Sequence, residues 1–201
     1  LNWPQAAVAT AGPELKIDAD NPYITLTDKD GQKAETKEEE LERFMVTVNS
    51  HDWGAYGKLQ VTAELKDGSS VLGHVDGRGS EYALTLPKDD DANRVGDWWE
   101  HWFDLKNAGG DADADRTPAG DGHEGDGISL YEEYRGFRVQ GRHERLSPEL
   151  KDLFIYDRNN LGLGYFQGSG LQLHRIGIME FSWTGGGGQR IPAVENPGDI
   201  I

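Results

Sequence analysis

The segment from Asp111 to Glu133 (DADADRTPAGDGHEGDGISLYEE) combines many acidic residues and glycines with few large apolar residues. It constrains the fold more than any other part of the chain. Between Lys88 and Asp126, twelve acidic residues oppose four basic ones, so half of the net charge of -16 lies in a fifth of the 201 residues. Like charges at this density repel one another and leave little apolar surface to bury. We therefore expect cations to be the partners of this segment.

The first part of the segment matches the opening of an EF-hand loop. Such a loop surrounds calcium with carboxylates at alternate positions, a Gly at position 6 for a sharp turn and a bidentate Glu at position 12. Asp111, Asp113 and Asp115 reproduce the Asp-x-Asp-x-Asp opening. In this register, however, Arg116 stands where the Gly is needed and Gly122 stands at position 12. The opening half alone is therefore incomplete.

The second part matches the closing half of the same loop. Asp126 falls at position 5, Gly127 at position 6 and Glu133 at position 12. Counted back from Asp126, position 3 is Glu124 and position 1 is Gly122, which has no side-chain ligand, and Asp121 lies one residue earlier. Two arrangements fit. In one, the loop carries an insertion and Asp121, Glu124 and Asp126 bind a single ion. In the other, the two halves serve two ions.

Ser129-x-x-Glu132 is a capping box, which predicts that a helix begins here. Both Glu132 and Glu133 then lie in its first turn, so the sequence leaves open which of them binds the ion. The competing interpretation is a solvated acidic loop without a metal. The predicted metal ligands are Asp111, Asp113, Asp115, Asp121, Glu124, Asp126, Glu132 and Glu133, and the predicted cofactor is calcium.

Before this segment, apolar residues alternate with polar ones in several short stretches, which is the pattern of strands with one buried face. The stretches are Leu15/Ile17, Ile24/Leu26, Met45 to Val48, Leu59 to Leu65 and Tyr82 to Leu86. Short strands at this spacing predict an immunoglobulin-like β-sandwich over residues 14–87. The charged run 35–42 (ETKEEELE) indicates a helical turn or an exposed loop.

Residues 93–106 place Trp98, Trp99 and Trp102 at helical spacing, which predicts an amphipathic helix with its tryptophans in the core. Further on, 151–156 (KDLFIY) and 171–181 (LQLHRIGIMEF) read as strands of an α+β unit. The predicted fold class is mainly β with α+β. The predicted parts are an N-terminal arm (1–13), the β-sandwich (14–87), a helix plus EF-hand-like segment (88–137) and a small α+β unit with a flexible tail (138–201).

Several classes of function lack their sequence signatures. The negative charge argues against nucleic-acid binding, and no run of about 18 apolar residues is long enough to span a membrane. The chain has no cysteine, so disulfides, thiolate nucleophiles and Cys-bound metals are excluded. The zinc-peptidase motif His-Glu-x-x-His fails at both His-Glu pairs, since Gly127 and Ser147 replace the second His. No nucleophile motif is present, so we expect no complete active site.

Two stretches, 86–100 (LPKDDDANRVGDWWE) and 125–137 (GDGISLYEEYRGF), resemble large secreted bacterial proteins. In these, an immunoglobulin-like domain leads into calcium-binding repeats of EF-hand or thrombospondin type 3 character. Residues 145–148 (RLSP) and 151–155 (KDLFI) are similar to a continuation that precedes a zinc metallopeptidase-like domain in some of them. The resemblance covers residues 59–175 and implies a calcium-binding protein that is secreted or on the cell surface.

The expected function is that of an extracellular, calcium-stabilised structural or interaction module. One alternative is the non-catalytic front part of a secreted metallopeptidase-like protein, whose partner would be a second fragment of the same precursor. The opening at Leu1 rather than Met suits such a processed piece and equally a cloning boundary. Another alternative is a surface adhesin or assembly subunit, with a protein or a surface polymer as its partner.

Overall fold

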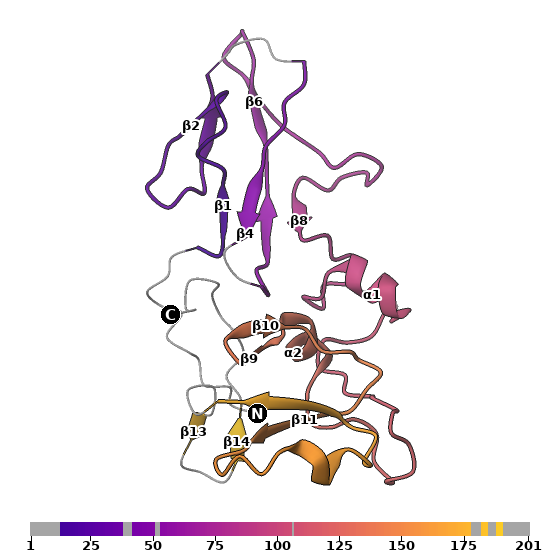
Figure 1. The fold of residues 1–201 in the computed structure, drawn as a ribbon. Coiled ribbons are helices and arrows are strands. Elements are labelled where there is room, and N and C mark those ends of the chain that lie inside the picture. Colours follow the sequence, from indigo (N-terminus) through magenta and orange to yellow (C-terminus); the bar gives the residue numbers. More distant parts are fainter. Residues whose placement is uncertain are drawn as a thin grey trace.

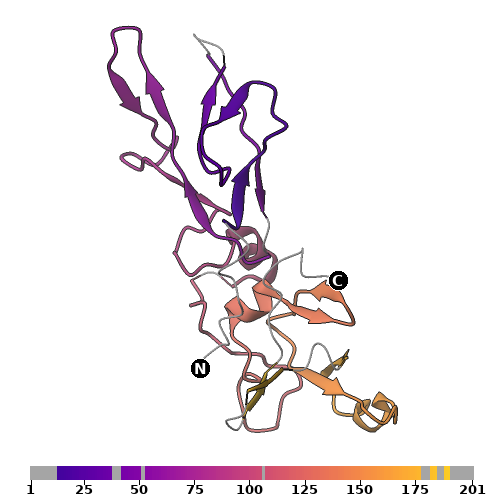
Figure 2. The same cartoon turned by 90° about the vertical axis from the view of Figure 1, so that its left-hand side faces the viewer.

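Short strands make up most of the regular structure of this chain. The computed structural model describes residues 13–37, 42–50, 53–105 and 107–177, and the backbone of 182–184 and 188–190. The predicted arm and the predicted tail therefore lie almost wholly outside the described residues. The fold is mainly β, as predicted. Residues 15–86 lie at one end of an elongated molecule and residues 137–176 towards the other, with helices between them (Figure 1, Figure 2).

The N-terminal part contains strands of three residues each. They are β1 (Leu15–Ile17), β2 (Ile24–Leu26), β3 (Ala34–Thr36), β4 (Val48–Ser50), β5 (Gly57–Leu59), β6 (Thr62–Glu64), β7 (Ser70–Leu72) and β8 (Leu84–Leu86). They pair antiparallel as β1 with β4, β2 with β3, β5 with β8 and β6 with β7. The described strands form two-stranded sheets, and the immunoglobulin-like sandwich stays a prediction.

One local prediction for this part is wrong, and another is not tested. The stretch from Leu59 to Leu65 is two strands rather than one, because the chain leaves β8 after Leu59 and pairs with β7 from Thr62 onwards. The run 35–42 begins inside strand β3, where Glu35 lies opposite Thr25 of β2, and its residues 38–41 lie outside the described residues, so the helical turn or exposed loop stays a prediction.

The two α-helices of the described chain pack against each other and form a small core. They are α1 (Asp97–Phe103) and α2 (Leu130–Arg135), and their buried cluster consists of Val95, Trp99, Leu130 and Tyr134. The ring of Trp99 lies edge-on to that of Tyr134, with centroids 5.6 Å apart. This cluster holds the acidic segment between the helices in place.

The helix predicted over 93–106 is present, but it is shorter and less buried than its pattern indicates. Asp104, with φ of 55°, ends it in a left-handed conformation. Trp99 is 3% exposed, whereas Trp98 is 53% and Trp102 80% exposed, so the prediction that all three are core residues is wrong. A helix of seven residues presents only one face to α2: Trp98 lies at the edge of this contact, with its ring centroid 6.4 Å from that of Tyr134, and Trp102 takes no part in the buried cluster.

The C-terminal part contains a hairpin and a parallel pair of strands. The hairpin joins β9 (Phe137–Val139) to β10 (Arg142–Glu144), and β11 (Asp152–Tyr156) pairs in parallel with β12 (Gln172–Ile176). Between β11 and β12 lies the 3-10 helix η2 (Leu163–Phe166), and β13 (Ser182–Thr184) pairs with β14 (Gly188–Arg190). The strand predicted for 151–156 is thus confirmed as β11, and the one predicted for 171–181 is confirmed over β12, while residues 178–181 lie outside the described residues. In the described part of the chain, no helix has the length and apolar character needed to cross a bilayer.

Candidate metal centre

The two halves of the acidic segment meet at one point. Asp113 and Asp115 lie on an extended stretch before α2, and the chain then makes a long excursion over residues 116–125 before it returns at Asp126. The extended stretch is fixed to the start of α2, because the backbone N–H of Leu130 donates to the carbonyl oxygen of Ala112 at 2.7 Å. Residues far apart in the loop are thereby brought together.

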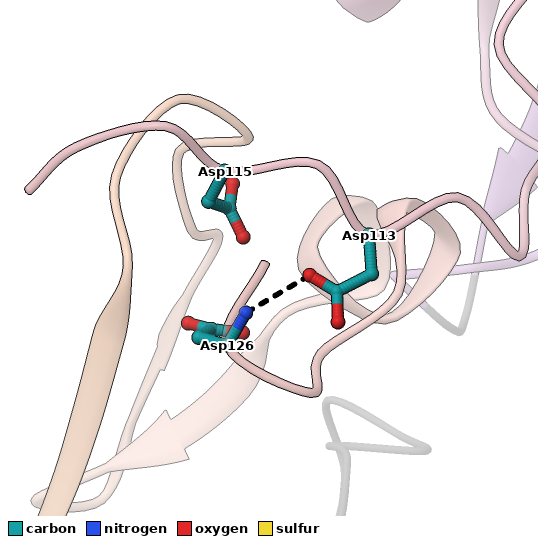
Figure 3. A group of neighbouring side chains, drawn as sticks. All are labelled: Asp113, Asp115 and Asp126. Carbon is teal, nitrogen blue, oxygen red and sulfur yellow. Dashed lines mark hydrogen bonds between the residues drawn. The ribbon is translucent and has the colours of Figure 1, made fainter. Parts of the chain in front are cut away.

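Asp113, Asp115 and Asp126 form the centre of this meeting point (Figure 3). Each offers one carboxylate oxygen, and these oxygens all lie within 4.8 Å of one another. Among the described residues, no other group of three His, Cys, Asp or Glu side chains is this close. The three aspartates are therefore arranged so that they could hold a metal ion.

Two glycines permit this arrangement. Gly125 has φ of +76°, and a Cβ atom there would lie only 1.9 Å from Oδ1 of Asp113. Its absence leaves room for that carboxylate, which accepts hydrogen bonds from the N–H groups of Asp126 at 3.0 Å and Gly127 at 2.8 Å. Gly127, with φ of +96°, makes the sharp turn that position 6 of the EF-hand pattern requires.

Glu133, a carboxylate of α2, lies outside the group of close oxygens but near enough for the charges of those aspartates to act on it. It is 2% exposed, and its Oε1 has no hydrogen-bond partner. Asp115 is similar, since it is 1% exposed and its Oδ2 has no partner. Burial, with the charges of Asp115 and Asp126 nearby, raises the pKa of Glu133 to about 10. Burial, with Asp126 and Asp113, raises the pKa of Asp115 to about 7.

Asp152, the first residue of β11, is a fifth member that the sequence reasoning missed. Its N–H donates to Asp126 Oδ2, its Oδ2 is buried without a partner, and its Oδ1 is hydrogen-bonded to the buried His174. The other ring nitrogen of His174 lies 3.2 Å from Glu144 Oε1. The only signal in the sequence is an acidic residue at the start of an apolar strand. We call Asp113, Asp115, Asp126, Glu133 and Asp152 the carboxylate cluster.

Glu132 and Glu133 have different roles in α2. Glu132 Oε2 accepts a hydrogen bond of 2.6 Å from the N–H of Ser129, which is the capping-box contact predicted from the sequence. Its neighbour Glu133 instead lies near the other carboxylates of the cluster, whose charges act on it. Glu132 caps the helix, and Glu133 is the one available to a metal.

The remaining predicted ligands lie away from the cluster. Asp111 and Glu124 are exposed and take no part in the group of close oxygens. Asp121 forms an ion pair of 2.6 Å with Lys151, which lowers the pKa of its carboxyl group. The buried Lys151 also donates to the carbonyl oxygen of His123 at 2.7 Å. These contacts fasten the excursion 116–125 to the start of β11.

The carboxylate cluster contains more negative charge than its surroundings balance. In the described part of the chain, no Lys or Arg forms an ion pair with any of its five members. Asp152 is the one member of the cluster that pairs with a described histidine, His174. Oxygen-only groups of this kind suit hard cations such as calcium or magnesium, whereas zinc and other softer ions favour nitrogen and sulfur ligands. The chain matches no family model, no curated protein and no solved structure.

Proposed function

We propose that this chain is a calcium-binding protein whose ion is held by the carboxylate cluster. The observation that carries the proposal is the pair of buried, unpartnered carboxylate oxygens, Asp115 Oδ2 and Glu133 Oε1, in a cluster with which no described Lys or Arg forms an ion pair. Burying an unpaired carboxylate costs several kcal/mol, by order of magnitude, unless a cation or a proton compensates. A divalent ion would compensate several of these groups at once.

The order of the residues supports calcium over magnesium. In one EF-hand register, Asp113 is position 1, Asp115 position 3, Asp126 position 5 and Glu133 position 12, with residues 116–125 inserted at position 4. The backbone carbonyl of position 7 would come from Ile128. This supply of oxygens suits the six to eight ligands of calcium, whereas magnesium prefers an octahedron that keeps several waters. One ion then serves both halves of the segment.

The ion would act as a structural clamp. The five carboxylates come from the extended stretch before α2, from the turn at Asp126, from α2 itself and from β11. Without a cation, bringing these elements together either sets like charges against one another at short range or makes buried carboxylates such as Glu133 take up protons. We therefore propose a non-catalytic structural or interaction module in which calcium joins the helical region to the C-terminal strands, following an N-terminal unit of immunoglobulin-like type.

A secreted or cell-surface location fits this role. Extracellular modules bind calcium with dissociation constants of about 0.1–1 mM, which suits surroundings where free calcium is abundant. The absence of cysteine is neutral on this point, because a metal can take the stabilising role that disulfides have in other extracellular domains.

Calcium titration of the chelator-stripped chain tests the proposal, with Asp115→Asn and Asp111→Asn as a matched pair. Both remove one acidic charge from the opening half of the segment, but only Asp115 belongs to the cluster. We expect Asp115→Asn to weaken calcium binding at the cluster by at least roughly 10–100-fold, the range found when only a group that supports a metal ligand is changed, and Asp111→Asn to leave it unchanged. Equal effects of the two substitutions would contradict the proposal.

A further inference from the structure

The connection between β11 and β12 exposes apolar side chains at one end of the molecule. It comprises residues 157–171 (DRNNLGLGYFQGSGL), which include η2 and lie at the end opposite β2 and β6 (Figure 1, Figure 2). Leu161 is 72%, Tyr165 86% and Phe166 40% exposed, and Tyr165 is the most exposed large hydrophobic residue of the described chain. We call residues 157–171 the Leu161 loop.

The Leu161 loop stands clear of its neighbours. At Gly162, Gly164 and Gly168, an added Cβ atom would meet nothing within 4 Å. Single exposed apolar residues are common on protein surfaces and need no explanation. Three of them within six residues, on a loop with open space around it, instead mark an interaction surface.

Hydrogen bonds within the loop hold its backbone. Asp157 accepts on Oδ1 from the N–H of Leu161 at 2.9 Å and on Oδ2 from the N–H of Gly162 at 2.7 Å. At the other end, the N–H of Ser169 donates to the carbonyl oxygen of Phe166 at 3.0 Å, and Ser169 Oγ accepts from the N–H of Leu171 at 3.2 Å. Backbone groups that are paired in this way can enter an apolar surface without losing their partners.

The charge of this part of the chain is opposite to that of the whole. Residues 158–179 form the longest run of the sequence without an acidic residue and contain Arg158 and Arg175, whereas the chain has a net charge of -16. The acid just before the run, Asp157, has a side chain that is only 7% exposed and lies 3.7 Å from Arg175. Arg158 is exposed and forms no ion pair with a described residue. The loop therefore offers a cation to a negatively charged partner.

We infer that the Leu161 loop docks on the surface of an anionic lipid bilayer, with Leu161, Tyr165 and Phe166 inserted at the boundary of headgroups and acyl chains. A bilayer presents apolar depth and negative charge on one surface, which matches the apolar residues of the loop and the arginine beside them. Tyrosine suits this boundary because its ring is apolar and its hydroxyl polar.

The long side chain of Arg158 would reach the headgroups while its apolar stem stays against the lipid. The acidic residues elsewhere in the chain oppose this contact little at physiological salt, since charges more than about 8 Å apart are largely screened. The inference rests on the exposure, the internal hydrogen bonds and the charge of the loop, and it does not require a metal at the carboxylate cluster.

The test is sedimentation of the full chain with vesicles in EDTA. One set contains equal amounts of phosphatidylcholine and phosphatidylserine, and the other contains phosphatidylcholine alone. We expect binding to the anionic vesicles that added salt weakens, and much weaker binding to the neutral ones. Leu161→Ser should lower the binding constant roughly 10-fold, and Arg158→Gln about 5-fold. The matched controls Leu65→Ser and Arg43→Gln change exposed residues of the N-terminal part and should bind as the wild type.

The inference would be overturned if the chain does not sediment with the anionic vesicles or binds both kinds equally. Equal binding by Leu161→Ser and Leu65→Ser would overturn it as well. If Leu161→Ser lowers the stability in urea, Tyr165→Ser decides, since its side chain is 86% exposed. Light scattering without lipid tests a second copy of the chain as the occupant. A dimer that Leu161→Ser dissociates would assign the loop to that contact and refute lipid docking.

Discussion

Replacing Glu133 with Gln should stabilise the calcium-free protein and remove part of its response to calcium. Glu133 is 2% exposed, and its burial among Asp115 and the other carboxylates raises its pKa from 4.5 to about 10. Without an ion, the folded chain therefore keeps a proton on Glu133 at neutral pH, while the unfolded chain does not. Folding must then take up this proton, which costs free energy.

The size of this cost follows from the linkage between proton binding and folding. Because the folded pKa lies above the unfolded value, the stability that Glu133 contributes is complete below pH 4.5 and is lost as the pH rises towards about 10. At about pH 7.5 the loss spans about three pH units of about 1.36 kcal/mol each, or about 4 kcal/mol in total. Gln does not titrate. In excess EDTA, Glu133→Gln should therefore exceed the wild type in stability by up to about 4 kcal/mol.

Urea unfolding at about pH 7.5, followed by the fluorescence of the buried Trp99, measures this difference. When free calcium is roughly 100-fold above the dissociation constant of the cluster, the wild type gains about 2.7 kcal/mol from that site, and Glu133→Gln should lose this increment. The exposed Glu124→Gln is the control and should behave as the wild type in both conditions. A Glu133→Gln variant that is less stable than the wild type in EDTA and keeps the whole calcium increment would refute the reasoning.

Three further predictions concern the same cluster. Gly125→Ala should weaken calcium binding and lower the free energy of unfolding in urea by about 1 kcal/mol or more, since the added Cβ would meet Asp113. Gly120 is also at positive φ but has open space around it, so Gly120→Ala should cost only the strain of the left-handed backbone and leave calcium affinity unchanged. Asp152→Asn should weaken calcium binding roughly 10–100-fold in calorimetry, and an unchanged affinity would remove this residue from the site. Calcium binding at neutral pH should release protons, because Glu133 must ionise, and the calcium affinity should rise with pH up to about pH 10. Titrations in buffers of different ionisation heat that show no proton release would contradict this.

Much of the candidate site could be predicted from local sequence, but its assembly could not. The Asp-x-Asp opening and the Asp-Gly closing half are both visible as motifs, and the register of Asp126 and Glu133 needs only counting. The meeting of the halves depends on contacts that close the excursion 116–125, such as the ion pair between Asp121 and Lys151. Asp152 joins the cluster through strand β11, a tertiary contact that no spacing rule describes.

The fold shows the same division. Alternating apolar residues located β1, β2, β6 and β8, but they met β4 and β5 at only one residue each and missed β3 and β7. They also did not reveal that the chain changes partners between Leu59 and Thr62, because pairing is a property of two segments. Helical spacing identified α1, but it could not show that a helix this short buries Trp99 and leaves Trp102 exposed.

A crystal structure of the chain grown in calcium tests the central claim most directly, since anomalous scattering locates the ion and atomic resolution gives its ligands. The account predicts a calcium ion at the carboxylate cluster, with oxygens of Asp113, Asp115, Asp126 and Glu133 at about 2.3–2.6 Å. A cluster without an ion, or a near-octahedral ion with contacts of about 2.0–2.1 Å, would contradict calcium binding there.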